Sequence, residues 1–450
     1  MGFTERILRN TDRGSVILFL AVVIAIGFAV RLPAGLVLNY GYDVHHWAII
    51  MANASSGNGL YGLTGYFYTP VWGYILGFMN MVQQATLTLG ETAFRVPEAL
   101  GFEAYDGWIS ANTTSMTYTF WVKLPLYLVD LLVAYLVYLA VLDYTGDRRK
   151  ALLGFALWFL NPLVILAPAV QGMFDNITAL LTLVGFMCIQ RRLYFCTGVT
   201  VGLAILLKLF PVFLLPLLVA YVLVKEERNL RRGLVSVVIA AVGVLLVAAV
   251  VFLPQLRDGT LSYCFTFLTA RASNAGGIIG MIAGSGTVIA YLAILLLSVL
   301  LALVFYRTAG RDLGREFLTY LLANLVLMFL YPPTPQYLVL LIPFLTIYVM
   351  VADRGYLRPL VWIAVFAALY ILANNFTLLL TLACDSNLIQ VATVVSLSDA
   401  LAPYWSLLFY GMGALQYLGI LYLAYLMYRG RLVDITAIKI FNKGGKADSQ

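Results

Sequence analysis

The stretch Gly233–Leu253 reads GLVSVVIAAVGVLLVAAVVFL and decides the fold, because it carries no charge over a length that can cross a bilayer. About 20 apolar residues in a helix span the roughly 30 Å of hydrocarbon in a membrane. Within lipid, only a helix or a closed barrel satisfies the backbone N–H and C=O groups. Comparable runs recur at Ser15–Val30, Thr287–Tyr306 and Leu360–Leu379. The sequence therefore predicts an all-α polytopic membrane protein.

The composition agrees with this prediction. Hydrophobic residues make up 62% of the 450 residues and charged residues only 11%, which is too little charge to cover a soluble domain of this size. The net charge of +7 does not indicate nucleic-acid binding, because the Lys and Arg residues lie in short clusters between apolar runs. We expect the membrane to be a partner and nucleic acid not to be one.

The basic clusters predict the topology, because cytoplasmic segments of membrane proteins are enriched in Lys and Arg. Placing clusters such as Arg148–Lys150 and Lys225–Arg232 on one side gives about twelve spanning helices and puts both termini in the cytoplasm. The predicted spans are Ser15–Arg31, Thr117–Asp143, Ala151–Ala169, Ile177–Gln190, Phe195–Lys208, Phe210–Val224, Gly233–Pro254, Thr287–Tyr306, Phe317–Tyr331, Tyr337–Ala352, Leu360–Leu379 and Tyr404–Tyr428.

This topology requires the apolar stretch Thr69–Leu89 not to cross the membrane, so we interpret it as a helix on the outer surface. Residues 1–450 then form one transmembrane domain, within which residues 38–115 are a large first external loop with interfacial helices. Val395–Leu401 is expected in a second external loop and Asp258–Ser285 in a third. Long ordered loops usually carry function.

Some basic residues fall outside the cytoplasmic segments: Arg31, Arg95, Lys123, Lys208, Arg257 and Arg271. Charge at membrane depth is costly and requires a partner or a task. Arg31 and Lys123 could snorkel to the interface, or Lys123 could pair with Asp130, seven residues further along the same helix face. Lys208 interrupts a long apolar stretch, so it is a candidate for binding an anionic headgroup, and Arg271 is a second candidate. Alternatively, Lys208 only breaks two short spans and Arg271 is only solvated.

Asp43 is the strongest candidate for catalysis. The segment Gly41–Trp47 reads GYDVHHW, follows the first predicted span, and contains both histidines of the chain. An aspartate beside histidines can act as a general base, and in a helix Asp43 and His46 share a face. The alternatives are a capping role for Asp43 and a metal site formed by Asp43, His45 and His46, although two adjacent histidines do not readily bind one ion from a regular helix.

Two further turns carry polar residues on the predicted outer side. In the turn Gln171–Asn176, Asp175 either caps the next helix or contacts a sugar. In Tyr331–Tyr337, Gln336 and Tyr337 either offer hydrogen bonds to a ligand or belong to a plain connector. Cys264 and Cys384 are both predicted outside, where they could pair or remain thiols.

Taken in order, these segments resemble membrane glycosyltransferases of the GT-C fold, and most closely the polyprenyl-phosphate-mannose-dependent mannosyltransferases, including the first mannosyltransferase of GPI-anchor synthesis. The resemblance covers about Arg31 to Phe344. The matching segments are Asp43, Asn58–Tyr61, Tyr66–Pro70, Lys123–Pro125 with Asp130, Asn161–Pro162, Gln171–Asp175, Leu207–Pro211, Pro335–Tyr337 and Pro343–Phe344.

The resemblance implies an inverting transfer of mannose from a polyprenyl or dolichyl phosphate to an acceptor hydroxyl at the extracytoplasmic or luminal face. Asp43 would be the base, and Lys208 and Arg271 would hold the donor phosphate. Acceptor or sugar contacts would come from the remaining candidates: His45, His46, Tyr68, Asp175, Gln336 and Tyr337. Some relatives carry two acids in a D-x-D arrangement, whereas residues 41 and 45 here are Gly and His. We therefore expect no metal and no other cofactor.

The alternative function is a polytopic transporter or lipid flippase, which would also need many helices and a few intramembrane charges. Transporters usually place ionisable groups near the membrane midplane and often contain internal repeats. The unusual residues of this chain map instead to one predicted side, which favours an enzyme. The acceptor, a glycan, a glycolipid or a protein, stays open at this point.

Overall fold

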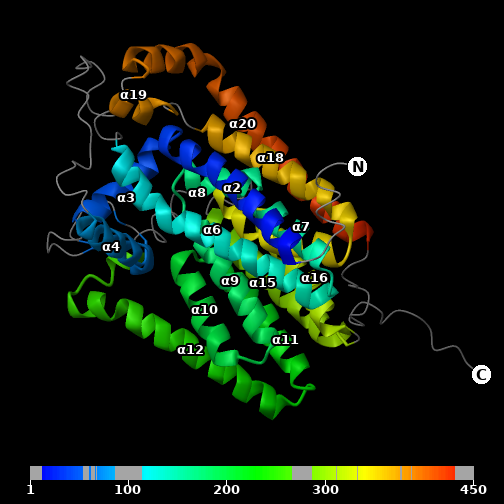
Figure 1. The fold of residues 1–450 in the computed structure, drawn as a ribbon. Coiled ribbons are helices and arrows are strands. Elements are labelled where there is room, and N and C mark those ends of the chain that lie inside the picture. The colour runs from blue at the N-terminus through cyan, green and yellow to red at the C-terminus, as the bar shows by residue number, and fades with distance from the viewer. Residues whose placement is uncertain are drawn as a thin grey trace, which may run out of the picture.

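The computed structural model describes residues 13–53, 60–61, 66, 68–86, 114–265, 286–310, 312–331, 333–374, 378–386 and 388–430, which form helices and no strands. The helices are α2 (Arg13–Val37), α3 (Gly41–Asn53), α4 (Pro70–Ala85), α6 (Met116–Thr145), α7 (Arg148–Phe159), α8 (Pro162–Ala169), α9 (Asp175–Gln190), α10 (Tyr194–Leu207), η3 (Phe210–Leu214), α11 (Leu215–Lys225), α12 (Leu230–Arg257), α15 (Gly286–Thr308), α16 (Leu313–Phe329), η4 (Pro335–Leu340), α17 (Ile342–Val351), η5 (Arg354–Tyr356), α18 (Leu357–Ala373), α19 (Leu380–Ser386) and α20 (Val391–Arg429), where η marks a 3₁₀ helix (Figure 1).

Within the described residues, six helices are long and apolar enough to cross a membrane: α2, α6, α12, α15, η5 with α18, and α20. Helices α7 and α8 together could form a seventh span that bends by 41°. The bend occurs where Pro162 cannot continue a helix, and Asn161 caps α8 by accepting from Leu163 N and Val164 N. These helices support the predicted multi-pass membrane protein. The remaining predicted spans coincide with shorter apolar helices or with α16, so twelve crossings remain a prediction.

Glycines allow α10 and α12 to pack closely. A Cβ atom on Gly198 would lie 1.9 Å from the carbonyl oxygen of Ala240, and one on Gly243 would lie 2.5 Å from that of Phe195. Gly202, one turn after Gly198, would bring its Cβ within 3.2 Å of the Cα of Val244. Small residues four apart are a common way for helices to approach each other in a membrane. This contact fixes the position of α10, whose far end carries Lys208.

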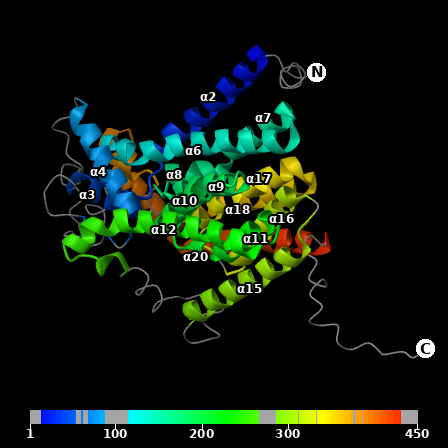
Figure 2. The ribbon, with the colours of Figure 1, turned by 90° about the horizontal axis from the view of Figure 1, so that it is seen from below.

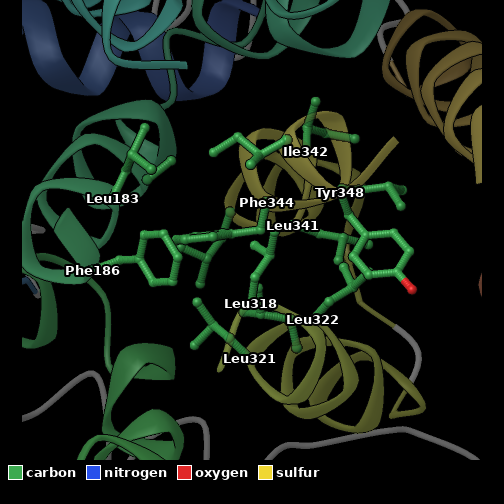
Figure 3. Close-up of a cluster of buried hydrophobic side chains, with 14 of the residues drawn as sticks. Leu183, Phe186, Leu318, Leu321, Leu322, Leu341, Ile342, Phe344 and Tyr348 are labelled. Carbon is green, nitrogen blue, oxygen red and sulfur yellow. The ribbon is translucent and has the colours of Figure 1, made fainter. Parts of the chain in front are cut away.

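The centre of the bundle is an apolar core between α9, α16 and α17. Phe186 of α9 stacks on Phe317 with ring centroids 5.2 Å apart, and it meets Phe344 of α17 edge-on at 5.6 Å. Figure 3 shows Phe186 pointing toward Phe344, with Leu321 of α16 below. Dense packing of this kind holds the helices as a rigid body.

Basic residues gather at one end of the bundle. Arg191 pairs with Asp143 at 2.6 Å, Arg192 with Glu226 at 3.7 Å, and Arg228 donates to the backbone oxygens of Tyr306 and Ala309. These contacts join the ends of α6, α9, α11 and α15. Helices α3 and α4 lie at the opposite end, whereas α2 begins and α20 ends on the basic side (Figures 1 and 2). The basic segments, which were predicted to share one side of the membrane, therefore lie at one end of the bundle, and the segments of α3 and α4 lie at the other. Which end faces the cytoplasm remains a prediction.

The predictions for Arg31 and Lys123 were wrong. Neither snorkels, because protein encloses both side chains completely. Asp130 pairs with Arg31, whose Nε lies 3.0 Å from Asp130 Oδ2, and not with Lys123. Lys123 Nζ instead donates to the backbone oxygen of Gly35 at 2.7 Å and to Asn39 Oδ1 at 2.8 Å. Lys123 therefore sits at the C-terminal end of α2, where the helix dipole favours a cation.

Two expected loop features also change. Val395–Leu401 is not a loop but part of α20, whose Val391, Val394 and Val395 pack on Leu380 of α19. Apolar residues spaced at i, i+3 and i+4 are typical of one face of a helix. No disulfide joins Cys264 and Cys384.

Candidate functional site

Lys208 lies in a box of aromatic rings at the end of the bundle opposite the basic clusters. Its Nζ lies 4.5 Å from the ring centre of Phe174, 5.1 Å from that of Tyr337 and 5.2 Å from that of Tyr68. The carboxylate of Asp175 is 3.4 Å away, and both charged side chains are almost entirely buried. Ring faces attract a cation strongly when water is excluded. Four residues selected from the sequence therefore meet at one point: Tyr68, Asp175, Lys208 and Tyr337.

Local sequence explains why Lys208 is placed there. Helix α10 ends at Leu207, and Lys208 has extended backbone angles of φ −144° and ψ 131°. Pro211 has no N–H to continue an α-helix, so the chain enters the short helix η3. Lys208 therefore lies just after the C-terminal end of α10, where the exposed carbonyl groups of the helix favour a positive charge.

Asp175 is placed by the start of α9. The expected capping role is wrong, since Phe174 occupies the N-cap position and Asp175 is the first residue of the helix. An acid in the first turn is favoured by the helix dipole. Because α9 and α10 are joined by the short connection at Arg191–Leu193, the start of the first and the end of the second lie side by side.

Hydrogen bonds from the segment before α4 hold Tyr68 against Lys208. The hydroxyl of Tyr61 donates to the backbone oxygen of Tyr68 at 2.5 Å. Thr69 Oγ1 donates to the backbone oxygen of Leu206, two residues before Lys208. The Tyr-Thr-Pro segment is therefore fixed to the end of α10.

Tyr337 reaches the box from the short helix η4. Its ring packs on Phe210 with centroids 4.6 Å apart, which ties η4 to η3. Gln336 is buried with 8% of its surface exposed, and Gln336 Oε1 has no hydrogen-bond donor among the described residues. Gln336 directly precedes Tyr337, whose ring lies beside Lys208. It remains a candidate for binding a polar group of a ligand.

Helix α3, which carries Asp43, packs beside this box. Asp43 is half-buried in the first turn, and Trp47 lies four residues later on the same face. The Trp47 ring contacts those of Tyr68 at 5.6 Å and Phe174 at 5.8 Å, two of the rings around Lys208. The face of α3 that bears Asp43 is therefore turned toward the Lys208 box.

Gly172 allows the close approach of α3. It adopts a left-handed backbone with φ +67°, and a Cβ there would lie 2.9 Å from Val44 and 3.6 Å from Trp47 Cδ1. Glycine adopts positive φ without steric cost. The turn before Asp175 thus contacts the residue next to Asp43.

The two histidines differ in their surroundings. Burial and the neighbouring His46 lower the pKa of His45 from 6.5 to about 4, so His45 is neutral at physiological pH. The ring of His46 lies edge-on to that of Trp47 at 5.3 Å. Across the described part of the chain, which includes Asp43, His45 and His46, no three His, Cys, Asp or Glu side chains are arranged to hold a metal ion. Metal independence of the reaction remains a prediction.

Some site residues were missed or cannot be placed. Phe174 and Trp47 were quoted within their motifs, but neither was given a role. Phe174 is next to Asp175 in the sequence, and only the packing of α9 beside α10 brings its ring to Lys208. Arg271, the second predicted phosphate ligand, lies outside the described residues.

Part of the chain matches the sequence model of a known protein family. Residues 116–333 match the sequence model of glycosyltransferase family 87. The matched part runs from α6 to the turn before η4 and includes Asp130, Asp175 and Lys208, but it excludes Asp43 and Tyr337. Together with the apolar helices, the match supports a membrane glycosyltransferase, which requires a sugar donor and an acceptor.

Proposed function

We propose that the chain is an inverting mannosyltransferase that uses a polyprenyl-phosphate donor, of the dolichyl phosphate mannose type. The acceptor is a hydroxyl of a glycan, glycolipid or protein at the extracytoplasmic or luminal face, and both termini are cytoplasmic. The proposal includes a GT-C fold with about twelve spans. The observation that carries it is the buried Lys208 in its aromatic box beside the helix of Asp43.

Lys208 is suited to an anionic donor. The phosphate of such a donor needs a cation, and its lipid chain needs apolar surroundings. Lys208 supplies the cation, and the aromatic rings around it supply the apolar surroundings. Arg271 is proposed as a second cation. The aromatic rings of Tyr68 and Tyr337 supply flat apolar surfaces that suit a sugar ring, and Gln336, Asp175, His45 and His46 are proposed to bind hydroxyl groups.

In the proposed reaction, Asp43 takes the proton of the acceptor hydroxyl. The acceptor oxygen forms a bond to the anomeric carbon from the face opposite the phosphate. The bond between the anomeric carbon and the phosphate oxygen breaks, and its electron pair leaves on the polyprenyl phosphate. Lys208 stabilises the negative charge on the leaving phosphate. Phosphate is a fair leaving group, so positioning and one or two cations account for much of the catalysis.

Asp43→Asn tests this proposal. The assay follows mannose transfer from a synthetic polyprenyl-phosphate mannose to an alkyl mannoside by the purified full-length protein. General-base catalysis contributes about 10²–10⁴-fold, so Asp43→Asn should lose activity on that scale while retaining donor binding. Asp399→Asn is the matched control, because Asp399 is exposed on α20.

Two results would contradict parts of the proposal. If Asp43→Asn keeps more than about a tenth of the rate, the base is another residue, and Asp175 is the next candidate. If EDTA abolishes transfer, the reaction needs a metal and Asp43, His45 and His46 must be reconsidered as its ligands.

A further inference from the structure

Asp130 lies inside the bundle and shares its carboxylate between two partners. Arg31 Nε lies 3.0 Å from Asp130 Oδ2, and Asn176 Nδ2 donates to Asp130 Oδ1 at 2.9 Å. At most 1% of any of these three residues is exposed. Asn176 directly follows Asp175, whose carboxylate pairs with Lys208. A continuous series of contacts therefore connects Arg31 to Lys208.

The first turn of α9 lacks the usual means of fixing a helix start. Its N-cap residue, Phe174, provides no side-chain hydrogen bond to the free N–H groups. Asn176 instead clamps this turn to α6 by donating to the backbone oxygen of Leu126 at 2.8 Å as well as to Asp130. The position of Asp175 thus depends on a contact between α9 and α6.

Asp130 is itself held rigidly. The Arg31 guanidinium that pairs with it lies 4.1 Å from the ring centre of Phe159, and Trp158 Nε1 donates to the Asp130 backbone oxygen at 2.9 Å. The Asp130 carboxylate is therefore a fixed hydrogen-bond acceptor for Asn176. Any movement would leave its buried charge without a partner where the dielectric constant is low.

We propose that Asn176 and Asp130 are positioning residues, which hold the Asp175–Lys208 pair in the position that binds the donor phosphate. The inference rests on the proposed role of Lys208 in donor binding. Neither residue touches the substrate. Their effect passes through the first turn of α9, so it should change the donor KM and not only protein stability.

Asn176→Leu removes the clamp at similar volume. We expect the donor KM for polyprenyl-phosphate mannose to rise about tenfold, as for loss of a well-placed charged contact. Gln190→Leu is the matched control. Gln190 also joins α9 to α6, by donating to the hydroxyl of Tyr144, but it is the last residue of α9 and lies at the opposite end of that helix from Asn176. It should lower the melting temperature and leave the donor KM unchanged.

A double-mutant cycle with Lys208→Met separates this inference from the proposed function. If Asn176 acts through Lys208, Asn176→Leu adds nothing to the KM of Lys208→Met. The positioning role alone would be overturned if the effects of the two substitutions on the donor KM were additive. It would also be overturned if Asn176→Leu left the KM unchanged while Lys208→Met raised it. A wild-type KM in Lys208→Met would overturn the donor role of Lys208 and with it this inference. Should Asn176→Leu fail to fold, Asn176→Ser is measured in the same cycle, since serine is too short to bridge both acceptors.

Discussion

The buried pair of Arg31 and Asp130 gives a quantitative test of the fold. Both side chains are completely enclosed. Replacing Asp130 by Leu leaves the Arg31 guanidinium with a backbone contact to Gly27 at 3.4 Å and the Phe159 ring. Breaking a buried pair from one side costs about 3–5 kcal/mol, because the remaining charge is uncompensated. We expect Asp130→Leu and Arg31→Leu each to lower the free energy of unfolding by about 3–5 kcal/mol.

The double replacement should be far less harmful. Removing both charges by similar apolar volume is often neutral or stabilising. In the double replacement, Asn176 loses its hydrogen bond to Asp130 and keeps the one to Leu126. The lost hydrogen bond lowers the free energy of unfolding by about 1 kcal/mol. The two single losses should therefore be non-additive, with a coupling free energy of at least about 3 kcal/mol.

The assay is unfolding of the purified protein by dodecyl sulfate in mixed micelles, with the four proteins of the cycle measured together. Arg191 and Asp143 provide the control cycle, since their pair is shorter at 2.6 Å but both side chains are more than half exposed. Exposed pairs contribute about 0–1 kcal/mol. If the Arg31–Asp130 coupling is no larger than the control coupling, burial does not govern this pair and our account of the network is wrong.

Two further predictions concern the pH response and helix packing. The lowered pKa of His45 means that the folded protein binds this proton less tightly than the unfolded chain, so stability should decline as pH falls from 6.5 toward about 4. The melting temperature of wild type should drop more between about pH 7 and about pH 4.5 than that of His45→Asn, and equal drops would contradict the assignment. Gly198→Ala should destabilise by about 1–3 kcal/mol, because the added Cβ meets the Ala240 oxygen at 1.9 Å. Gly411→Ala, which meets nothing within 4 Å, is the control in the same melting experiment, and an equal effect would refute the packing argument.

The helices were predictable because apolar runs and proline breaks are local. The run predicted at Gly233–Pro254 corresponds to α12 at Leu230–Arg257. The break after Lys208 was visible from the following proline. The prediction failed at Val395–Leu401, which was placed in the external loop between the predicted spans Leu360–Leu379 and Tyr404–Tyr428. The segment lies in α20, one face of which packs on α19, and composition alone does not reveal that contact.

Side-chain partners were harder to predict. Lys123 and Asp130 are spaced correctly for a pair within one helix, but the actual partner of Asp130 lies on α2. Which face of α2 packs on α6 is a tertiary question that spacing does not answer. The pair of Asp175 and Lys208 was accessible in principle, because two antiparallel helices with a short connection bring the start of one beside the end of the other. Each residue was selected separately, and the pairing was missed.

In the part of the chain that the structure describes, three cations are buried, and they differ in what holds them, which supports distinct roles. Arg31 has a carboxylate at 3.0 Å, and Lys123 has two neutral oxygens at the end of α2. Lys208 has three ring faces and a carboxylate at 3.4 Å, longer than the roughly 2.7–2.9 Å of a strong charge-assisted hydrogen bond. An anionic ligand can compete with a long ion pair more readily than with a short one. Arg31 and Lys123 are therefore suited to fixing α2 against α6, and the longer ion pair of Lys208 supports its proposed role in binding the donor phosphate.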